Sequence, residues 1–162
     1  MRVSEAVEPA LHLLVLLASL PPGVALTSAD LAEFHDLAPA QTAKVLQRLG
    51  SAGILAATEG RTGGYRLAAQ AEQISVAAIV RAVEQGPAFR CREIRRCGPC
   101  AGPPAIYSAR CGIAALMDEA EAAWWRCLDA QSLADLTRRV GAGIEKGVLV
   151  RSSDWLARRS RT

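Results

Sequence analysis

The chain has 162 residues, enough for one core domain with appendages, and 51% of them are hydrophobic, which excludes a chain that is disordered throughout. Its formal net charge of +3 is too small to indicate a nucleic-acid partner by itself. The charge is unevenly distributed: residues 1–37 carry one basic and five acidic side chains, and residues 38–66 carry four basic and one acidic. A local basic segment indicates either a surface that faces phosphates or a solvated face.

The apolar run from Leu11 to Leu20 is too short to span a bilayer, and it contains His12. Glu5 and Glu8 precede it, which does not fit the positively charged start of a secretory signal. We therefore expect a cytoplasmic protein with no membrane partner. Cytoplasmic thiols are normally reduced, so the five cysteines indicate metal or redox chemistry before structural disulfides.

The first helix is expected over about residues 4–20. Pro9 fits only the first turn of a helix, so the helix could also begin there. The sequence Pro-Pro-Gly at 21–23 ends it.

Two short helices are expected next. The first is capped by Thr27 or Ser28 and runs to about His35, and the second covers residues 40–49 after Pro39. Two short helices joined by a three-residue turn are typical of a helix-turn-helix. Their apolar positions, which we expect to form a shared core, are Leu31, Phe34, Leu37, Val45, Leu46 and Leu49.

A glycine-rich segment then separates two short strand patterns. Residues 54–58 indicate one strand, the sequence Glu-Gly-Arg-Thr-Gly-Gly at 59–64 a turn, and residues 65–67 the returning strand. A β-hairpin directly after a helix-turn-helix is a wing. The expected fold class is therefore mainly α with a small β-hairpin, with a winged helix-turn-helix domain over residues 1–70.

A helix over residues 75–84 and the cysteine-bearing loop after it form a linking segment, residues 71–110. A long helix follows over residues 111–131. Its apolar side chains recur at spacings of four and three, which is typical of a helix that packs against a partner helix. They are Ile113, Met117, Ala120, Trp124 and Cys127.

The alternative is that this helix packs against the chain's own core. A winged helix already has its core, so we favour a homodimer through a dimerisation segment over residues 111–140. Residues 132–140 are expected to add one or two helical turns. The basic tail, residues 141–162, shows no clear pattern and is expected to be partly disordered.

The wing resembles the most specific motif of the Rrf-two family of winged-helix regulators, a group of iron–sulfur and nitric-oxide sensing repressors. It reads Gly60-Arg61-Thr62-Gly63-Gly64-Tyr65-Arg66-Leu67, and Ile74-Ser75 and Val83-Glu84 match the helix that follows. The cysteines after that helix and the long helix after them also match, so the similarity spans about residues 1–140. The resemblance implies a regulator, and specifically a repressor, that binds an operator in double-stranded DNA; it implies no enzymatic activity.

The second helix of a helix-turn-helix presents its N-terminal residues to the major groove, which predicts that Gln41, Thr42 and Lys44 lie there. Gln pairs with adenine, and Lys reaches guanine or phosphate. Arg48, one turn further on, either contacts phosphate or pairs with Glu33. A dimer would read two half-sites about 34–36 Å apart.

Arg61 is expected at the tip of the wing, where a guanidinium can enter a narrow minor groove. Gly63 and Gly64 would let the backbone approach the duplex closely, and Tyr65 beside them is also expected to bind DNA. The alternative is that the two glycines merely form a hairpin turn.

Four cysteines, Cys91, Cys97, Cys100 and Cys111, follow the linking helix, and three interpretations compete. Thiolates are the usual ligands of an iron–sulfur cluster, which the resemblance favours. Cys97-Gly-Pro-Cys100 copies the thioredoxin tetrapeptide, and nearby arginines favour thiolates, so a reversible disulfide is the second. A four-cysteine zinc site usually shows two Cys-x2-Cys pairs, and the chain has one. Cys127 is expected to be a small buried residue.

The family also includes a mixed-ligand variant, in which a glutamate and histidines from the DNA-binding half and one loop cysteine hold a [2Fe–2S] cluster shared between subunits. The resemblance assigns these ligands to Glu8, His12, His35 and Cys111. Spacing alone favours a solvated Glu8–His12 pair and a surface His35. The competing all-thiolate set, Cys91, Cys97, Cys100 and Cys111, would hold a [2Fe–2S] or [4Fe–4S] cluster.

The function expected is therefore a regulator whose DNA affinity is set by an iron–sulfur cluster or by redox state. One alternative is a regulator without a cofactor or with a thiol–disulfide switch. The other is a small redox protein with no role on DNA; the sequence has no phosphate loop and no Ser-His-Asp arrangement to support an enzyme.

Overall fold

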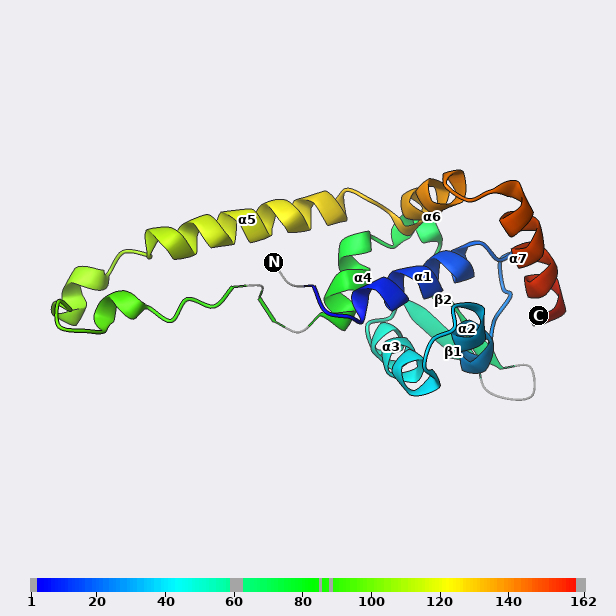
Figure 1. Ribbon diagram of the computed structural model, residues 1–162, viewed down its shortest axis with the longest axis horizontal. Helices are drawn as coiled ribbons and strands as arrows, with labels where there is room; N and C mark the ends of the chain where they lie inside the picture. The colour runs from blue at the N-terminus through cyan, green and yellow to red at the C-terminus, as the bar shows by residue number, and fades with distance from the viewer. Residues whose placement is uncertain (1–2, 59–62, 85, 88, 160–162) are drawn as a thin grey trace.

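The computed structural model describes residues 3–58, 63–84, 86–87 and 89–159. Figure 1 shows a packed body, from which a long helix and the segment before it extend as an arm. The body contains a helix-turn-helix and a β-hairpin, as expected for a mainly α winged-helix fold. The described part of the chain has no helix that is both long enough and apolar enough to cross a membrane.

Helix α1 (Val7–Ala18) forms the centre of the body, because apolar residues recur on one of its faces at helical spacing. Ala10, Leu13 and Leu14 are fully buried there. Helix α2 (Ser28–Phe34) begins with a capping box, in which Thr27 and Asp30 each accept a hydrogen bond from the other's backbone N–H. Helix α3 (Pro39–Ser51) starts with proline in its first turn.

The expected shared core of the helix-turn-helix is largely confirmed. Leu31, Val45, Leu46 and Leu49 are buried. Phe34 and Leu37 are only partly buried at its edge, and Phe34 has a second set of neighbours described below.

Strands β1 (Leu55–Thr58) and β2 (Gly64–Leu67) pair antiparallel, with Leu55 opposite Leu67 and Thr58 opposite Gly64. The hairpin is attached to the body by a bridge between Leu26 and Tyr65. The Tyr65 N–H donates to the Leu26 carbonyl at 2.7 Å, and the Leu26 N–H donates to the Tyr65 carbonyl at 3.1 Å. This bridge fixes the base of the wing.

A short 3₁₀ turn, η1 (Ala71–Gln73), leads from the wing to α4 (Val76–Val83), which packs against α1. The arm then carries two further 3₁₀ turns, η2 (Ile94–Arg96) and η3 (Pro104–Tyr107), and returns through the long helix α5 (Gly112–Asp129). Arg81 of α4 joins α5 to the body, because it forms an ion pair with Asp129 and lies over the Trp125 ring.

Helix α6 (Leu133–Ala142) lies where one or two helical turns were expected, and it packs against α1. The tail differs from the sequence-based expectation, because it forms a further helix, α7 (Lys146–Arg159), in place of an irregular segment. Only a few of its side chains face the body, among them Trp155 and Leu156, so its apolar pattern is too sparse to recognise in the sequence.

Candidate functional sites

The N-terminal part of α3 presents polar side chains to solvent. Gln41 and Lys44 are exposed, consistent with the predicted contacts to the major groove. The prediction for Thr42 is wrong: its side chain is fully buried, and its hydroxyl donates to the Ala38 carbonyl at 3.2 Å. Thr42 therefore holds the first turn of α3 and cannot reach a base.

Arg48 does not pair with Glu33, one of its two predicted partners, and its phosphate contact stays a prediction. Its guanidinium donates to the Val83 carbonyl at 3.1 Å and so satisfies the end of α4. Glu33, the other candidate partner, is paired with Arg159 instead. Arg48 thus ties α3 to α4, and a phosphate contact would have to displace this hydrogen bond.

The wing tip, including Arg61, lies outside the described residues, so its predicted DNA contact stays a prediction. The base of the wing is described, and it gives Gly64 a structural reason. A Cβ at Gly64 would lie 2.7 Å from the Leu26 carbonyl oxygen and 2.9 Å from its carbon. The backbone approach that needs glycine here is therefore made by the chain itself. Tyr65 beside it is half-buried, and Gly63 belongs to neither strand.

A second site lies between α1 and the end of α2. His12 of α1 and His35, the residue that ends α2, have ring centroids 5.3 Å apart. Together with Glu5, Glu8, Pro9 and Leu37 they surround a cavity of about 330 Å³. We call it the histidine pocket. The structure thus brings together three of the four residues of the mixed-ligand set, although Glu8 and His35 are far apart in sequence.

His35 is the least exposed of these three residues. Its Nε2 atom is buried and has no hydrogen-bond partner within the described part of the chain. Burial, and then repulsion from His12, lower the pKa of His35 below its ordinary value. A buried imidazole nitrogen without a partner is a candidate metal ligand, because neutral imidazole is the form that binds metals. The surface-residue alternative for His35 does not describe this environment.

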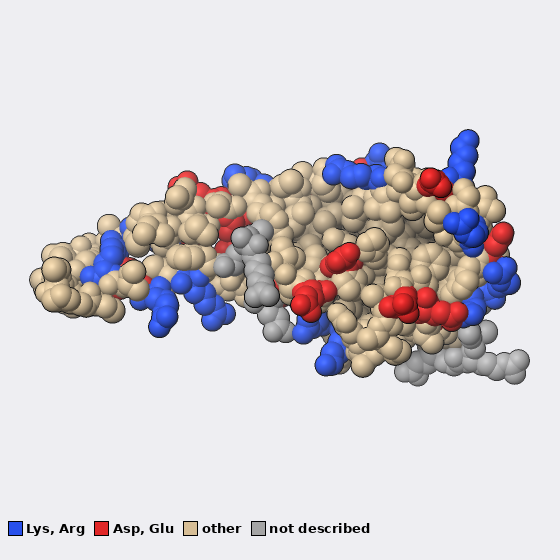
Figure 2. Space-filling model, viewed as in Figure 1, with Lys and Arg blue, Asp and Glu red and all other residues tan. Residues whose placement is uncertain are grey.

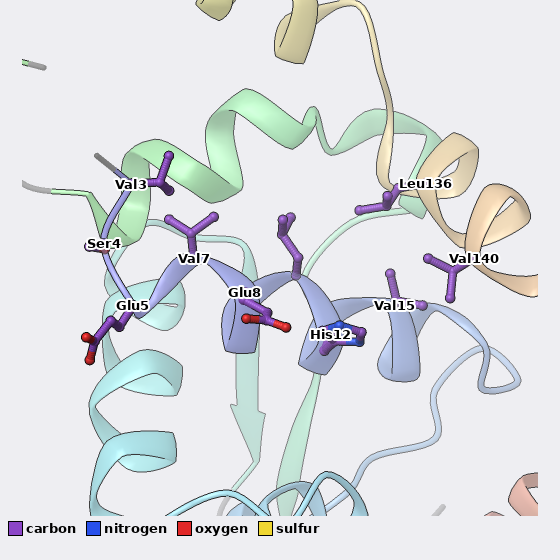
Figure 3. Close-up of a pocket in the computed structure, with 10 residues that line it drawn as sticks. Val3, Ser4, Glu5, Val7, Glu8, His12, Val15, Leu136 and Val140 are labelled. Atoms are coloured by element: carbon purple, nitrogen blue, oxygen red, sulfur yellow. The ribbon is translucent and has the colours of Figure 1, made fainter. Parts of the chain in front are cut away.

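An apolar groove of about 460 Å³ continues from the histidine pocket along α1. Figure 3 shows Glu8 and His12 on α1, with Leu136 and Val140 coming from α6. Figure 2 shows acidic side chains across the middle of the same face, over α1 and α2. The groove is therefore apolar, and the pocket beside it is acidic.

The cysteines lie away from this pocket, along the arm. Cys91, Cys97 and Cys100 are exposed, and Cys111 is half-buried at the residue that caps α5. The backbone N–H groups of Ala114 and Ile113, with a smaller contribution from Arg95, lower the pKa of the Cys111 thiol. Cys127 is exposed, so the prediction that it is buried is wrong.

Neither ligand set is gathered at one place in the described part of the chain. Among the residues that the structure describes, no three His, Cys, Asp or Glu side chains are arranged to hold a metal ion. Cys111 caps the end of α5 that points away from the body, while the histidine pocket lies in the body (Figure 1). Sequence spacing could not predict that His12 and His35 meet, because their contact depends on how α2 packs.

Comparison with known proteins identifies the fold and the family. The model of the Rrf2 family, described as an iron-dependent transcriptional regulator, matches residues 3–139. The chain belongs to this family. The regulator is 28% identical over 138 residues to the HTH-type transcriptional regulator NsrR of Bacillus subtilis, which covers 85% of this chain and 91% of the relative. It is 29% identical over 136 residues to NsrR of Geobacillus kaustophilus, covering 84% and 89%.

Solved structures have the same fold. An IscR protein of T. potens superposes with a TM-score of 0.69 at 18% identity and covers 93% of this chain and 96% of its own. CymR, the global cysteine regulator of B. subtilis, gives a TM-score of 0.65 at 20% identity and covers 86% and 98%. These structures show the fold, and membership of a family of transcription regulators gives the role: the chain is a DNA-binding transcription regulator and not an enzyme, which excludes a redox protein with no role on DNA.

Proposed function

We propose that the regulator is a homodimeric repressor whose affinity for its operator is set by an iron–sulfur cluster. The cluster is a [2Fe–2S] cluster held between two subunits, by Glu8, His12 and His35 from the DNA-binding half and by Cys111. The observation that carries this proposal is the histidine pocket, where one buried imidazole nitrogen has no partner. Such a regulator acts in the cytoplasm, where the DNA is.

The residues present fit a cluster of mixed ligands. Imidazole nitrogen, carboxylate oxygen and thiolate sulfur all bind iron, and histidine ligands occur in [2Fe–2S] centres of raised potential. Cys111 has a thiol whose pKa is lowered by the start of α5 and by Arg95, which favours the thiolate that a metal needs. The acidic residue Glu5 beside the pocket adds negative charge that favours a cationic centre.

Cys111 reaches the pocket only if a second subunit supplies it. The first turns of α5 expose apolar side chains that one chain leaves without cover: Ile113 is 67% exposed, Leu116 65% and Met117 37%. The apolar groove along α1 and α6 is the complementary surface in the body. In a two-fold dimer each α5 can occupy the partner's groove, and each Cys111 then lies beside the partner's histidine pocket.

The cluster, when bound, supplies a centre that gains or loses one electron. The chain's own residues connect that centre to DNA. His35 ends α2 and is followed by Asp36 in the left-handed conformation, at a φ of 51°. Leu37 lines the pocket, and Pro39 begins α3 two residues later. A change in what His35 binds therefore acts on the turn that aims the exposed Gln41 and Lys44.

The test compares two variants purified without air. His12→Ala should lose the native cluster absorption, while the double variant Cys97→Ala, Cys100→Ala should keep it. If the histidine variant keeps the native spectrum and the cysteine variant loses it, the loop thiols hold the iron and the mixed-ligand proposal is wrong.

A further inference from the structure

Helix α7 ends against α2, the first helix of the helix-turn-helix. Arg159 donates through Nη1 and Nη2 to the two carboxylate oxygens of Glu33, at 2.7 and 3.0 Å. Its Nη1 also donates to Asp30 Oδ1 at 3.1 Å. A planar guanidinium that bonds both oxygens of a carboxylate fixes orientation as well as distance. One side chain of α7 therefore contacts two residues one turn apart on α2.

Asp30 depends on this contact. Its side chain is 7% exposed, and its other oxygen accepts hydrogen bonds from the Thr27 hydroxyl and N–H in the capping box. Burial alone would raise the pKa of Asp30, but the bonds from Thr27 and Arg159 lower it below its ordinary value. Arg159 is the cation beside this buried carboxylate, and a buried charge that loses its counter-ion is costly, so removing Arg159 affects the start of α2 directly.

An aromatic contact also joins α7 to the C-terminal end of α2. The rings of Trp155 and Phe34 meet edge to face, with centroids 5.2 Å apart, and the Arg159 guanidinium lies 4.9 Å from the Trp155 ring. Phe34 in turn meets the His35 ring at 4.9 Å. The same stack therefore runs from α7 through the end of α2 to the histidine pocket.

We infer that α7 is a strap across α2, and that Trp155 and Arg159 are positioning residues for DNA binding. Helix α2 has only seven residues, too few to be stable alone, and its end sets the turn into the recognition helix α3. Fixing both ends of α2 therefore fixes the direction of α3. The strap lies outside the part of the chain that defines the family, residues 3–139. The role of the strap depends on DNA binding by the regulator and not on the proposed cluster.

The test compares Arg159→Gln with Arg158→Gln. Arg158 is exposed and has no ion-pair partner among the described residues, so it is a matched control in the same turn. The probe is a duplex that the wild-type regulator selects from random-sequence DNA. Arg159→Gln should lower affinity about tenfold, the scale of a charged hydrogen-bond pair, with an unchanged salt slope because no phosphate contact is lost. Arg158→Gln should change neither quantity.

If Arg158→Gln lowers both affinity and salt slope, α7 is a phosphate-binding element and the strap is wrong; unchanged affinity of Arg159→Gln also overturns it. A conservative variant guards against simple misfolding. Arg159→Lys keeps a cation beside Asp30 and Glu33 and should lose less affinity than Arg159→Gln, and an equal loss contradicts the strap. Repeating the titrations after chelation of iron separates the two proposals: the effect of Arg159→Gln should persist there, and an effect that disappears with the iron contradicts a strap independent of the cluster.

Discussion

Replacing Gly64 with alanine tests the base of the wing, where the chain approaches itself most closely. The added Cβ would lie 2.7 Å from the Leu26 carbonyl oxygen and 3.3 Å from the Ala25 Cβ. Its closest neighbour is backbone, which cannot rotate away, so either the overlap persists or the Leu26–Tyr65 bridge opens. Overpacking costs about 1–3 kcal/mol, and loss of two hydrogen bonds costs about the same. We expect the free energy of unfolding to fall by about 1–3 kcal/mol.

The matched control is Gly50→Ala in α3, where an added Cβ meets nothing within 4 Å. Alanine in place of glycine inside a helix should stabilise the protein by about 0.5–1 kcal/mol. Urea unfolding followed by tryptophan fluorescence measures both variants. Operator binding of the Gly64 variant should also weaken, because the wing shifts on its base. A Gly64 variant as stable as the wild type would refute the argument that the backbone approach requires glycine.

Three further predictions concern DNA, assembly and pH. Arg61→Ala should weaken operator binding and reduce its salt slope by about one while the fold stays intact, and an unchanged titration would reject the wing as a DNA contact. Met117→Asp should produce monomers or aggregates in sedimentation, because a buried unpaired charge is costly, whereas wild type that sediments as a monomer at micromolar concentration would rule out the dimer. Burial would raise the pKa of Asp30, but its hydrogen bonds hold it below the ordinary value, so its stabilisation is complete above about pH 4. That stabilisation is lost as pH falls through the lowered pKa, and Asp30→Asn should flatten this acid limb in unfolding midpoints; an equally steep limb would contradict the bonding of Asp30.

The sequence predicted the helix-turn-helix, the hairpin and the long helix because each has a local signal: a cap, a proline in the first turn, a glycine turn or a helical repeat. The prediction for Thr42 was wrong because it used the position of the residue along α3 and not the side of the helix on which it lies. Which side of α3 faces the body is set by tertiary packing, and Thr42 lies on the buried side. The helix α7 was missed because only a few of its side chains hold it to the body, among them Trp155, Leu156 and Arg159, and these do not form an apolar stripe.

The histidine pocket could not be predicted from the sequence pattern either. His12 and His35 are separated by two helix ends and a loop, so their contact follows from tertiary packing and not from spacing. The resemblance to a family supplied the pair, and the buried Nε2 atom of His35 supplied an independent reason to consider it a ligand. Cys111 is the one proposed ligand that does not line the histidine pocket of its own chain.

The most direct measurement is therefore cluster content in a heterodimer of His12→Ala and Cys111→Ala subunits, purified by a different tag on each. Each homodimer should lack the cluster, because every site misses one ligand. In the heterodimer the His12 of one subunit and the Cys111 of the other meet in one intact site, so about half of the wild-type cluster absorption should return if ligands are shared across a two-fold interface. A heterodimer that stays without iron and colour, like its parents, would contradict the shared site.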